Sequence, residues 1–347
     1  MRVLVTGGAG FIGANLVQHL VRTEPTARVT VLDALTYAGN LASLEPVADA
    51  VGVVQGDVCD ERLVDRLVGG CDLVVHCAAE SHNDLSLAEP SAFVRTNVTG
   101  TAVLLEAARR HGTRFHHVST DEVYGDLALD DPARFTEASP YDPSSPYSAT
   151  KAGSDLLVRA WVRSLGVVAT VSNGSNTYGP YQHVEKFVPR QITNLLDGAR
   201  PVVYGSGRNV RSWLHVADHV AAIWAVASRG RPGRSYLVGA DDEVDNLTVV
   251  RMLLALFGRP DSDVELVADR PAHDRRYSLD STRLRRELGW LPRRSDLWRG
   301  LEQTVEWYRE NESWWRPAKA ATEERYRAAG QAPLDPPTAP PGGRAAP

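Results

Sequence analysis

Hydrophobic and polar residues follow two alternating patterns in the first half of the chain. Short runs of β-branched and other apolar residues alternate with longer stretches in which apolar residues recur every three or four positions. The short runs are typical of strands that are buried on both faces, and the longer stretches are typical of amphipathic helices. The alternation predicts a doubly wound α/β fold with a parallel sheet. The predicted strands are residues 2–6, 28–33, 51–55, 72–77, 114–119 and 167–172.

The pattern changes at about residue 175, where loops lengthen and short strands mix with helices. We therefore expect a Rossmann-type sheet domain at 1–175 that also carries the reactive residues. A smaller mixed α/β lobe at 176–316 should be interleaved with it and cover the carboxyl edge of the sheet. The segment 317–347 is rich in alanine and proline, which predicts a disordered tail.

Composition narrows the class of protein. The chain has 347 residues, is 43% hydrophobic and carries a net charge of −5 without a basic block, so a nucleic-acid partner is not expected. No apolar run approaches the roughly 18 residues that a membrane span needs. A strand pattern begins at residue 2, which leaves no room for a signal peptide. Cys59, Cys71 and Cys77 lack metal-site spacing and lie in or beside apolar runs. We expect buried free thiols, no metal and a cytoplasmic protein.

A glycine-rich stretch, TGGAGFIG at 6–13, follows the first strand and opens the first predicted helix. Gly7, Gly10 and Gly13 are three residues apart, as a tight turn, a close backbone approach and a helix–sheet contact require. The start of the helix then offers free N–H groups to a pyrophosphate. Asp33 ends the second strand, where its carboxylate can bind ribose hydroxyls and would repel a 2′-phosphate, so NAD is favoured over NADP. Asp57 ends the third strand and either meets the adenine or serves a turn.

Tyr147 and Lys151 are spaced i, i+4 in a predicted helix that starts after Pro146. They therefore share a face, about 6 Å apart along the axis. To act as a base near pH 7, a tyrosine needs its pKa lowered from about 10, and a lysine ammonium about 4 Å away and an oxidised nicotinamide ring would both lower it. Lysine stands only at 151, 186 and 319 in a chain with 38 basic residues, which suggests a specific need for an ammonium group. The alternative is a surface pair on a helix.

Two adjacent carboxylates follow the predicted strand at 114–119. Asp121 and Glu122 come directly after Thr120. Crowding of two acids raises the pKa of one and leaves the other ionised, which suits an acid–base couple. Neighbours in a regular strand point to opposite faces, so both can reach one substrate only if the chain bends, and we expect a loop at 121–122. The alternative for Asp121 is a strand-end turn or a helix cap.

Several motifs together resemble one family, the dTDP-glucose 4,6-dehydratases of the extended short-chain dehydrogenase/reductase superfamily. The similarity runs from about residue 1 to residue 316. The glycine motif and Tyr-x-x-x-Lys are shared by the whole superfamily, whereas Thr-Asp-Glu is more specific. The motifs are TGGAGFIG, LDALTYAGN (32–40), AAESH (78–82), STDEVYG (119–125), SPYSATK (145–151), SNTYGPY (175–181), RPAHDRRY (270–277) and EWYRENESWW (306–315).

The resemblance implies a hydro-lyase that uses NAD to convert dTDP-glucose into its 4-keto-6-deoxy derivative. C4 is oxidised, water is eliminated across C5 and C6, and the hydride returns to C6. By resemblance, Glu122 is the base at C5, Asp121 is the acid at C6, and Thr120 holds the C4 oxygen with Tyr147. The alternatives are a 4-epimerase, a dehydratase of another regiochemistry or nucleotide, and, from another class, a non-catalytic NAD-binding protein.

The resemblance also implies two sets of binding residues. The expected cofactor-binding residues are Gly7, Gly10, Phe11, Ile12, Gly13, Asp33, Leu35, Thr36, Asp57, Val58, Ala78, Ala79, Ser81, Thr96, Tyr147 and Lys151. The expected substrate-binding residues are Ser81, Thr120, Asn176, Lys186, Tyr204, Arg211, Asn246, Arg270 and His273.

The sequence departs from the family at two places. The family usually reads His-Val-Asp-Arg-Ser where this chain has Asn83 and Leu85 at the second and fourth positions, and Ser212 stands where an acid is usual. A modified sugar or another nucleotide could therefore be the substrate. As in the family, helices at about 90–111 and 147–164 should pair into a homodimer through a four-helix interface. Apolar positions that motivate this pairing, unless they are covered within the monomer, are Val103, Leu104, Leu156, Leu157 and Trp161.

The arginine-rich composition suggests a high-GC bacterium, where such enzymes supply deoxysugars to cell walls and to secondary metabolites such as antibiotics.

Overall fold

The computed structural model describes residues 1–269 and 273–328 and is built on one seven-stranded sheet. All of its strands are parallel, in the order β11-β6-β5-β4-β1-β2-β3, which confirms the predicted doubly wound α/β fold. The strands are β1 (Arg2–Thr6), β2 (Arg28–Asp33), β3 (Val51–Gln55), β4 (Leu73–His76), β5 (Arg114–Thr120), β6 (Ala169–Gly174) and β11 (Ser235–Val238).

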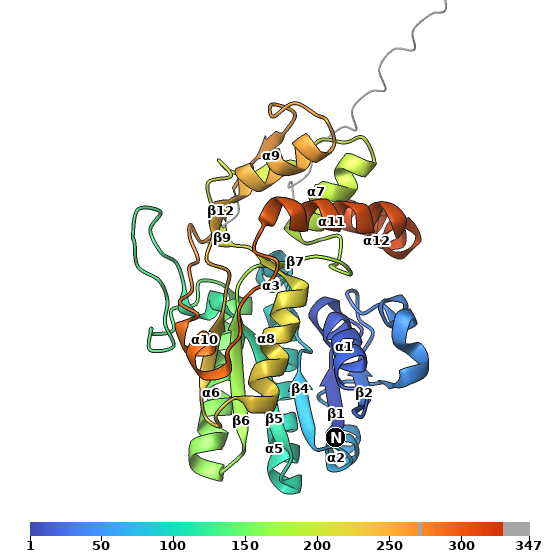
Figure 1. Cartoon of the computed structure of the whole chain (residues 1–347), viewed down its shortest axis with the longest axis vertical. Coiled ribbons are helices and arrows are strands. Elements are labelled where there is room, and N and C mark those ends of the chain that lie inside the picture. Colours follow the sequence, from blue (N-terminus) through green and yellow to red (C-terminus); the bar gives the residue numbers. More distant parts are fainter. Residues whose placement is uncertain (270–272, 329–347) are drawn as a thin grey trace, which may run out of the picture.

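Helices cover both faces of the sheet (Figure 1). On one face, α1 (Phe11–Thr23) and α8 (Val216–Arg229) bury leucine and valine side chains against β1, β2 and β4. The other face is covered by α2 (Glu61–Gly69), α5 (Gly100–His111) and α6 (Pro146–Leu165). Strands between two helical layers are apolar on both sides, which explains their continuous hydrophobic runs.

The remaining short elements connect this framework. Residues 90–111, predicted as one helix, form three consecutive segments with a π-helical middle. These elements are η1 (Leu41–Ala50), α3 (Asn83–Ala88), α4 (Pro90–Phe93), η2 (Val94–Thr99), η3 (Asp121–Tyr124) and α10 (Thr282–Leu288).

The second lobe lies above the carboxyl ends of the sheet strands in Figure 1. Its core joins four helices, α7 (Phe187–Leu196), α9 (Asn246–Leu256), α11 (Leu297–Glu310) and α12 (Glu312–Ala328). Three strand pairs support them: β7 (Thr177–Tyr178) with β10 (Leu214–His215), β8 (Val202–Tyr204) with β13 (Glu265–Val267), and β9 (Val210–Ser212) with β12 (Glu243–Asp245). The chain returns to the sheet for α8 and β11, so the segment 176–316 is divided between the two lobes.

The prediction of disorder from residue 317 is wrong up to Ala328, because α12 continues through this segment. Its buried side chains are Trp315, Lys319, Thr322 and Tyr326, which recur at helical spacing and so lie on one face. The alanine- and proline-rich composition concealed that pattern. Residues 329–347 lie outside the described part of the chain.

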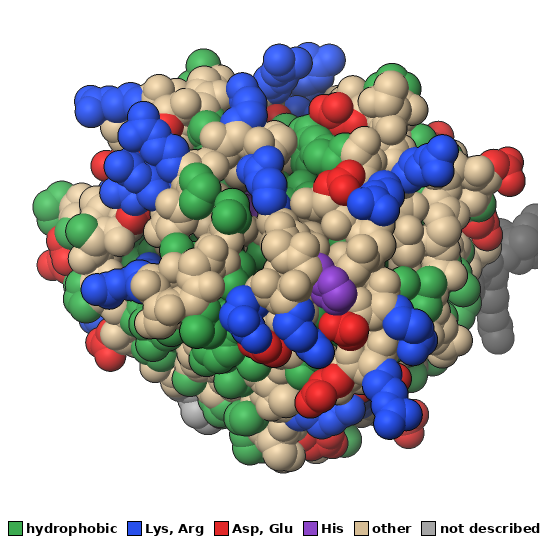
Figure 2. All heavy atoms as spheres, turned by 90° about the horizontal axis from the view of Figure 1, so that it is seen from below, with side chains coloured by type: hydrophobic (Ala, Val, Ile, Leu, Met, Phe, Trp, Pro, Cys, Tyr) green, Lys and Arg blue, Asp and Glu red, His purple; other side chains and the backbone are tan. Residues whose placement is uncertain are grey.

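Two further expectations concern the thiols and the surface. All three cysteines are free, as predicted, but each is half-buried rather than buried. Within residues 1–269 and 273–328, no helix is both long and apolar enough to cross a membrane. On the face seen in Figure 2, acidic and basic side chains are interspersed.

Candidate active site

The glycine motif forms a tight cradle between β1 and α1. Gly7 has a φ of +68°, and a Cβ there would lie 2.6 Å from the backbone nitrogen of Ala78. A Cβ on Gly13 would overlap the carbonyl oxygen of Gly7. The first turn of α1 holds no acid, and no side chain of the described residues caps it. Its free N–H groups and positive helix end therefore fit a pyrophosphate, as the motif predicts.

Asp33 is held at the end of β2 for a ribose. Its Oδ2 accepts a 2.9 Å hydrogen bond from the backbone of Ala9, and its Oδ1 accepts one of 2.8 Å from Leu35. Leu35 itself packs against the core and does not line the cofactor cavity, so its expected cofactor contact is replaced by this role in orienting Asp33. Leu35 has a φ of +54°, in the left-handed region that non-glycine residues seldom adopt.

Asp57 closes a turn and also lines the cofactor cavity, so its position is compatible with both functions that the sequence left open. It lines the cofactor cavity, and its Oδ1 also accepts a 2.8 Å hydrogen bond from the backbone of Cys59, which closes a turn. Its Oδ2 lies 2.7 Å from a guanidinium nitrogen of Arg95.

Two cavities meet between the sheet and the lobe. The larger, of about 470 Å³, is lined by all the expected cofactor residues except Leu35. The larger has the volume of a small-ligand pocket. The smaller, of about 180 Å³, lies under the lobe. They share the residues Ser81, Glu122, Asn176, Glu185 and Lys186. A ligand in the larger cavity therefore borders one in the smaller cavity at Glu122.

The two carboxylates lie where the larger cavity meets the smaller. β5 ends at Thr120 and the 3-10 turn η3 begins at Asp121, so the chain bends where the sequence predicted it. The turn is capped by Thr120 rather than by Asp121, because the threonine hydroxyl accepts a 3.3 Å hydrogen bond from the backbone of Glu122. Both carboxylates line the larger cavity, together with Tyr147.

Asp121 has the environment of a protonated acid. It is 2% exposed, and its Oδ2 is buried without a hydrogen-bond partner among the described residues. Burial raises its pKa to about 8, the neighbouring Glu122 adds to the rise, and Arg211 opposes it. At neutral pH the group therefore holds a proton that it can donate.

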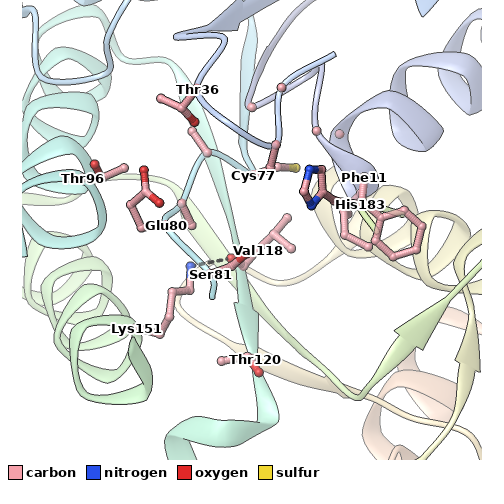
Figure 3. A pocket seen from close by; sticks show the side chains of 18 of the residues that line it. Phe11, Thr36, Cys77, Glu80, Ser81, Thr96, Val118, Thr120, Lys151 and His183 are labelled. Atoms are coloured by element: carbon pink, nitrogen blue, oxygen red, sulfur yellow. Dashed lines mark hydrogen bonds between the residues drawn. The ribbon is translucent and has the colours of Figure 1, made fainter. Parts of the chain in front are cut away.

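Helix α6 carries both Tyr147 and Lys151 into the cavity. A capping box between Ser145 and Ser148 fixes its first turn, and Pro146 starts it. The Lys151 ammonium donates a 2.9 Å hydrogen bond to the carbonyl of Val118. In Figure 3, Lys151 extends from α6 toward β5, and Thr120 lies at the end of the same strand.

The pKa values of Tyr147 and Lys151 are shifted in directions that the i, i+4 spacing alone did not predict. Burial lowers the pKa of Lys151 to about 8, and the carboxylate of Asp155 opposes that effect. Burial raises the pKa of Tyr147, Glu122 and Asp121 raise it further, and a hydrogen bond with Thr120 opposes them. The spacing of Tyr147 and Lys151 suggested that the lysine would lower the pKa of the tyrosine. The surrounding side chains and burial instead raise it. The cationic ring of an oxidised nicotinamide would act in the lowering direction.

The expected substrate residues gather around the smaller cavity. Lys186 donates a 2.6 Å hydrogen bond to the carbonyl of Ser81, and Arg211 donates one of 2.8 Å to the carbonyl of Asp274. Thr120 lines the larger cavity, and Arg270 lies outside the described residues. The expected residues that line the smaller cavity are Ser81, Asn176, Lys186, Tyr204, Arg211, Asn246 and His273.

Other lining residues were missed from the sequence. Asn83, Arg190 and Tyr326 line the smaller cavity, while Ser212 lines neither. The guanidinium carbon of Arg190 lies 3.5 Å from the ring centroid of Tyr326, and Arg190 also pairs with Glu323 at 3.0 Å. In the larger cavity, Cys77, Glu80 and His183 lie beside the expected residues (Figure 3). Glu80 lies within the AAESH motif but was not singled out, whereas Arg190, Tyr326 and His183 lie outside the motifs.

The comparisons with known proteins agree with this geometry. A family model described as GDP-mannose 4,6 dehydratase matches residues 4–302. A dTDP-glucose 4,6-dehydratase from Mycobacterium tuberculosis is 61% identical over 95% of this chain and 100% of its own length. One from Streptomyces niveus is 49% identical over 93% and 97%.

Solved structures extend the likeness. A dTDP-glucose 4,6-dehydratase from Streptomyces venezuelae with NAD and TYD bound is 48% identical and has a TM-score of 0.89, with 92% of this chain and 100% of that chain covered. A UDP-glucose 4-epimerase from Thermotoga maritima is 28% identical and has a TM-score of 0.83, with 90% and 100% covered. The chain belongs to the dTDP-glucose 4,6-dehydratases, the family that its motifs resemble.

Proposed function

We propose that this protein is an NAD-dependent hydro-lyase that converts dTDP-glucose into dTDP-4-keto-6-deoxyglucose. One observation carries the proposal: a buried acid, Asp121, and a second carboxylate, Glu122, line the same cavity as Tyr147, where the cofactor and substrate cavities meet. Oxidation at C4 needs the tyrosine as the base and a bound NAD as the hydride acceptor. Elimination of water from C5 and C6 needs the two carboxylates.

The proposed roles assign each proton transfer at the sugar; one turnover leaves Tyr147 with an extra proton and Asp121 without one, so a proton must pass from the first to the second before the next turnover. Bound NAD supplies an acceptor for the C4 hydride, which later returns to C6. Tyr147 takes the proton of the C4 hydroxyl, whose oxygen Thr120 holds, and the C5 proton becomes acidic. Glu122 removes that proton, while Asp121 protonates the C6 hydroxyl, which leaves as water. Glu122 then returns a proton to C5.

The substrate and cofactor are supported by charges on both sides of the junction. Lys186 and Arg211 offer cations to a diphosphate in the smaller cavity. Asp33, with two backbone donors already bound, favours a ribose without a 2′-phosphate.

A 4-epimerase is the nearest alternative, because it needs the same tyrosine and cofactor. The Asp121–Glu122 pair favours dehydration, since returning a hydride to C4 uses neither acid. The same pair in the cavity disfavours a non-catalytic NAD-binding protein.

The experiment is a product assay on dTDP-, UDP-, GDP- and CDP-glucose. The 4-keto product develops a characteristic absorbance in alkali. We expect it from dTDP-glucose most rapidly. Absence of the signal with all four nucleotides would reject the dehydratase, and faster turnover of another nucleotide would reassign the base.

We also propose a homodimer through α5 and α6, which lie side by side on one face of the sheet. Leu156 on α6 is 54% exposed, which supports an unpaired apolar surface. Leu104 is fully buried within the monomer and so does not contribute. Sedimentation should give a dimer that Leu156→Glu weakens, and a monomer for the unaltered chain would reject the proposal.

A further inference from the structure

Asn83, one of the two departures from the family motif, contacts the proposed base. It is the first residue of α3, in the wall of the smaller cavity. Its amide nitrogen donates a 3.0 Å hydrogen bond to Oε2 of Glu122. Valine, the usual residue of the family at this position, has no donor to offer.

The other end of the same amide reaches the helix that carries the tyrosine. The hydroxyl of Ser145 donates a 3.1 Å hydrogen bond to Oδ1 of Asn83. Ser145 is the N-cap of α6 and stands two residues before Tyr147. One planar amide thus joins Glu122 to the first turn of α6.

These two contacts fix the orientation of the amide. An asparagine has one acceptor oxygen and one donor nitrogen. Turning the group over would place its oxygen against the carboxylate oxygen of Glu122 and its nitrogen against the serine hydroxyl, which then could no longer donate to it. The donor therefore stays directed at Glu122.

The backbone at Asn83 is held as well. The hydroxyl of Ser86 donates a 2.7 Å hydrogen bond to the carbonyl of Asn83. His82 caps α3 by accepting a 3.2 Å hydrogen bond from the backbone of Leu85, and its other ring nitrogen lies 3.3 Å from the hydroxyl of Tyr326 on α12. The start of α3, which carries the Asn83 side chain, is therefore held against α12 of the second lobe by the contact between His82 and Tyr326.

We propose that Asn83 is a positioning residue for the dehydration, which orients the carboxylate of Glu122 for both proton transfers at C5. The inference rests on the proposed function. Glu122 must take a proton from C5 and later return one to the same carbon, so its carboxylate needs one orientation throughout the turnover. Asn83 acts through Glu122 and does not need to touch the reacting atoms.

The test compares Asn83→Val, Asn83→Asp and a control on the same short helix, Leu87→Ala, whose side chain is 47% exposed. Removing a hydrogen bond to a charged group should lower kcat about tenfold for the valine variant, with KM changed less than about twofold. Asn83→Asp keeps the shape but sets a carboxylate against Glu122, so we expect a larger fall, about a hundredfold. The control should behave as the unaltered protein.

A kinetic isotope effect separates positioning from packing. With substrate deuterated at C5, the isotope effect on kcat should rise in Asn83→Val, because C5 deprotonation becomes slower than the other steps. A role in packing alone predicts the opposite order, with the isosteric aspartate variant nearly unaffected. Bound NAD and the melting temperature of each variant should match those of the unaltered protein.

The possible failures are distinct. An unaltered protein without keto product rejects the proposed function itself. An active protein in which Asn83→Val leaves kcat and the C5 isotope effect unchanged rejects only the role of Asn83. Should the valine variant fail to fold, the aspartate variant decides, and full activity there overturns the inference.

Discussion

The cofactor side and the substrate side of this site are built in different ways. The cofactor cavity is formed by consecutive residues at strand ends, where β1 meets α1 and β5 meets η3, and much of its binding surface is backbone. The substrate cavity is formed by single side chains from distant segments, such as Asn83, Arg190 and Tyr326. The cofactor residues can be predicted from local motifs and their spacing, whereas the substrate residues were predicted only where the family resemblance supplied them, and the contributions of Arg190 and Tyr326 were missed.

Removal of the proposed base, Glu122, should have the largest effect, and it should affect the dehydration rather than the oxidation at C4. Glu122→Gln keeps the shape but loses the base at C5, so product formation should fall by about a hundredfold to ten-thousandfold. C4 oxidation should persist, because Tyr147 is unchanged, and should be seen as a transient absorbance of reduced nicotinamide. Glu106→Gln, on the surface of α5, is the control. Product formation at the normal rate in Glu122→Gln would favour the epimerase.

The ion pairs that hold α12 against the rest of the second lobe should contribute to the free energy of unfolding. Glu323 pairs with the buried Arg190 and Lys319, so Glu323→Ala removes the carboxylate that neutralises two buried cations and should lower the free energy of unfolding by about 3 kcal/mol. Glu312→Ala on the same helix breaks an exposed pair with Arg316 and should cost less than about 1 kcal/mol. Denaturant unfolding measures both.

Glu323→Ala should also affect the kinetics of the substrate cavity without affecting the cofactor cavity. Because Arg190 lines only the substrate cavity, Glu323→Ala should raise KM for the nucleotide sugar while NAD content stays constant. Equal stability of the two α12 variants would show that α12 does not support this wall.

A substitution in the cofactor cavity should have the opposite effect to Glu323→Ala: NAD binding should weaken, and KM for the nucleotide sugar should stay the same. Asp33→Asn replaces a carboxylate that accepts from two backbone groups and should weaken NAD binding about tenfold. KM for the nucleotide sugar, measured at saturating NAD, should stay the same. Titration of cofactor-free protein with NAD measures the effect, and unchanged affinity would contradict the role of Asp33.

The pH dependence is the mildest expected effect. Asp121 and Lys151, each with a pKa of about 8, must both be protonated, the first to donate a proton and the second to remain a cation. Loss of either proton above this pH should therefore lower the activity about tenfold for each further pH unit, or more steeply where both groups ionise. Asp155→Asn removes the carboxylate that holds the pKa of Lys151 up, so the fall should begin at a lower pH. His117 and His76, which also interact with Lys151, are neutral because burial lowers the pKa of each, and the nearby Cys77 stays a neutral thiol because burial raises its pKa to about 12. A profile flat to pH 9 would contradict these assignments.

The difference between the two sides also explains what the sequence could predict. The sheet, the glycine cradle and the bend after Thr120 follow from contiguous residues and local backbone rules. Helix α12 was missed because its alanine-rich composition outweighed the spacing of Trp315, Lys319, Thr322 and Tyr326. The contact of Asn83 with Glu122 joins residues 39 positions apart, and the raised pKa of Tyr147 depends on burial that no motif encodes.

The destination of the C4 hydrogen tests the central claim most directly. Substrate carrying deuterium at C4 is converted, and the position of the label in the product is read by nuclear magnetic resonance. A dehydratase of this kind delivers the deuterium to C6, and C5 acquires a proton from solvent through Glu122. Deuterium that remains at C4 of an epimerised sugar would contradict the account.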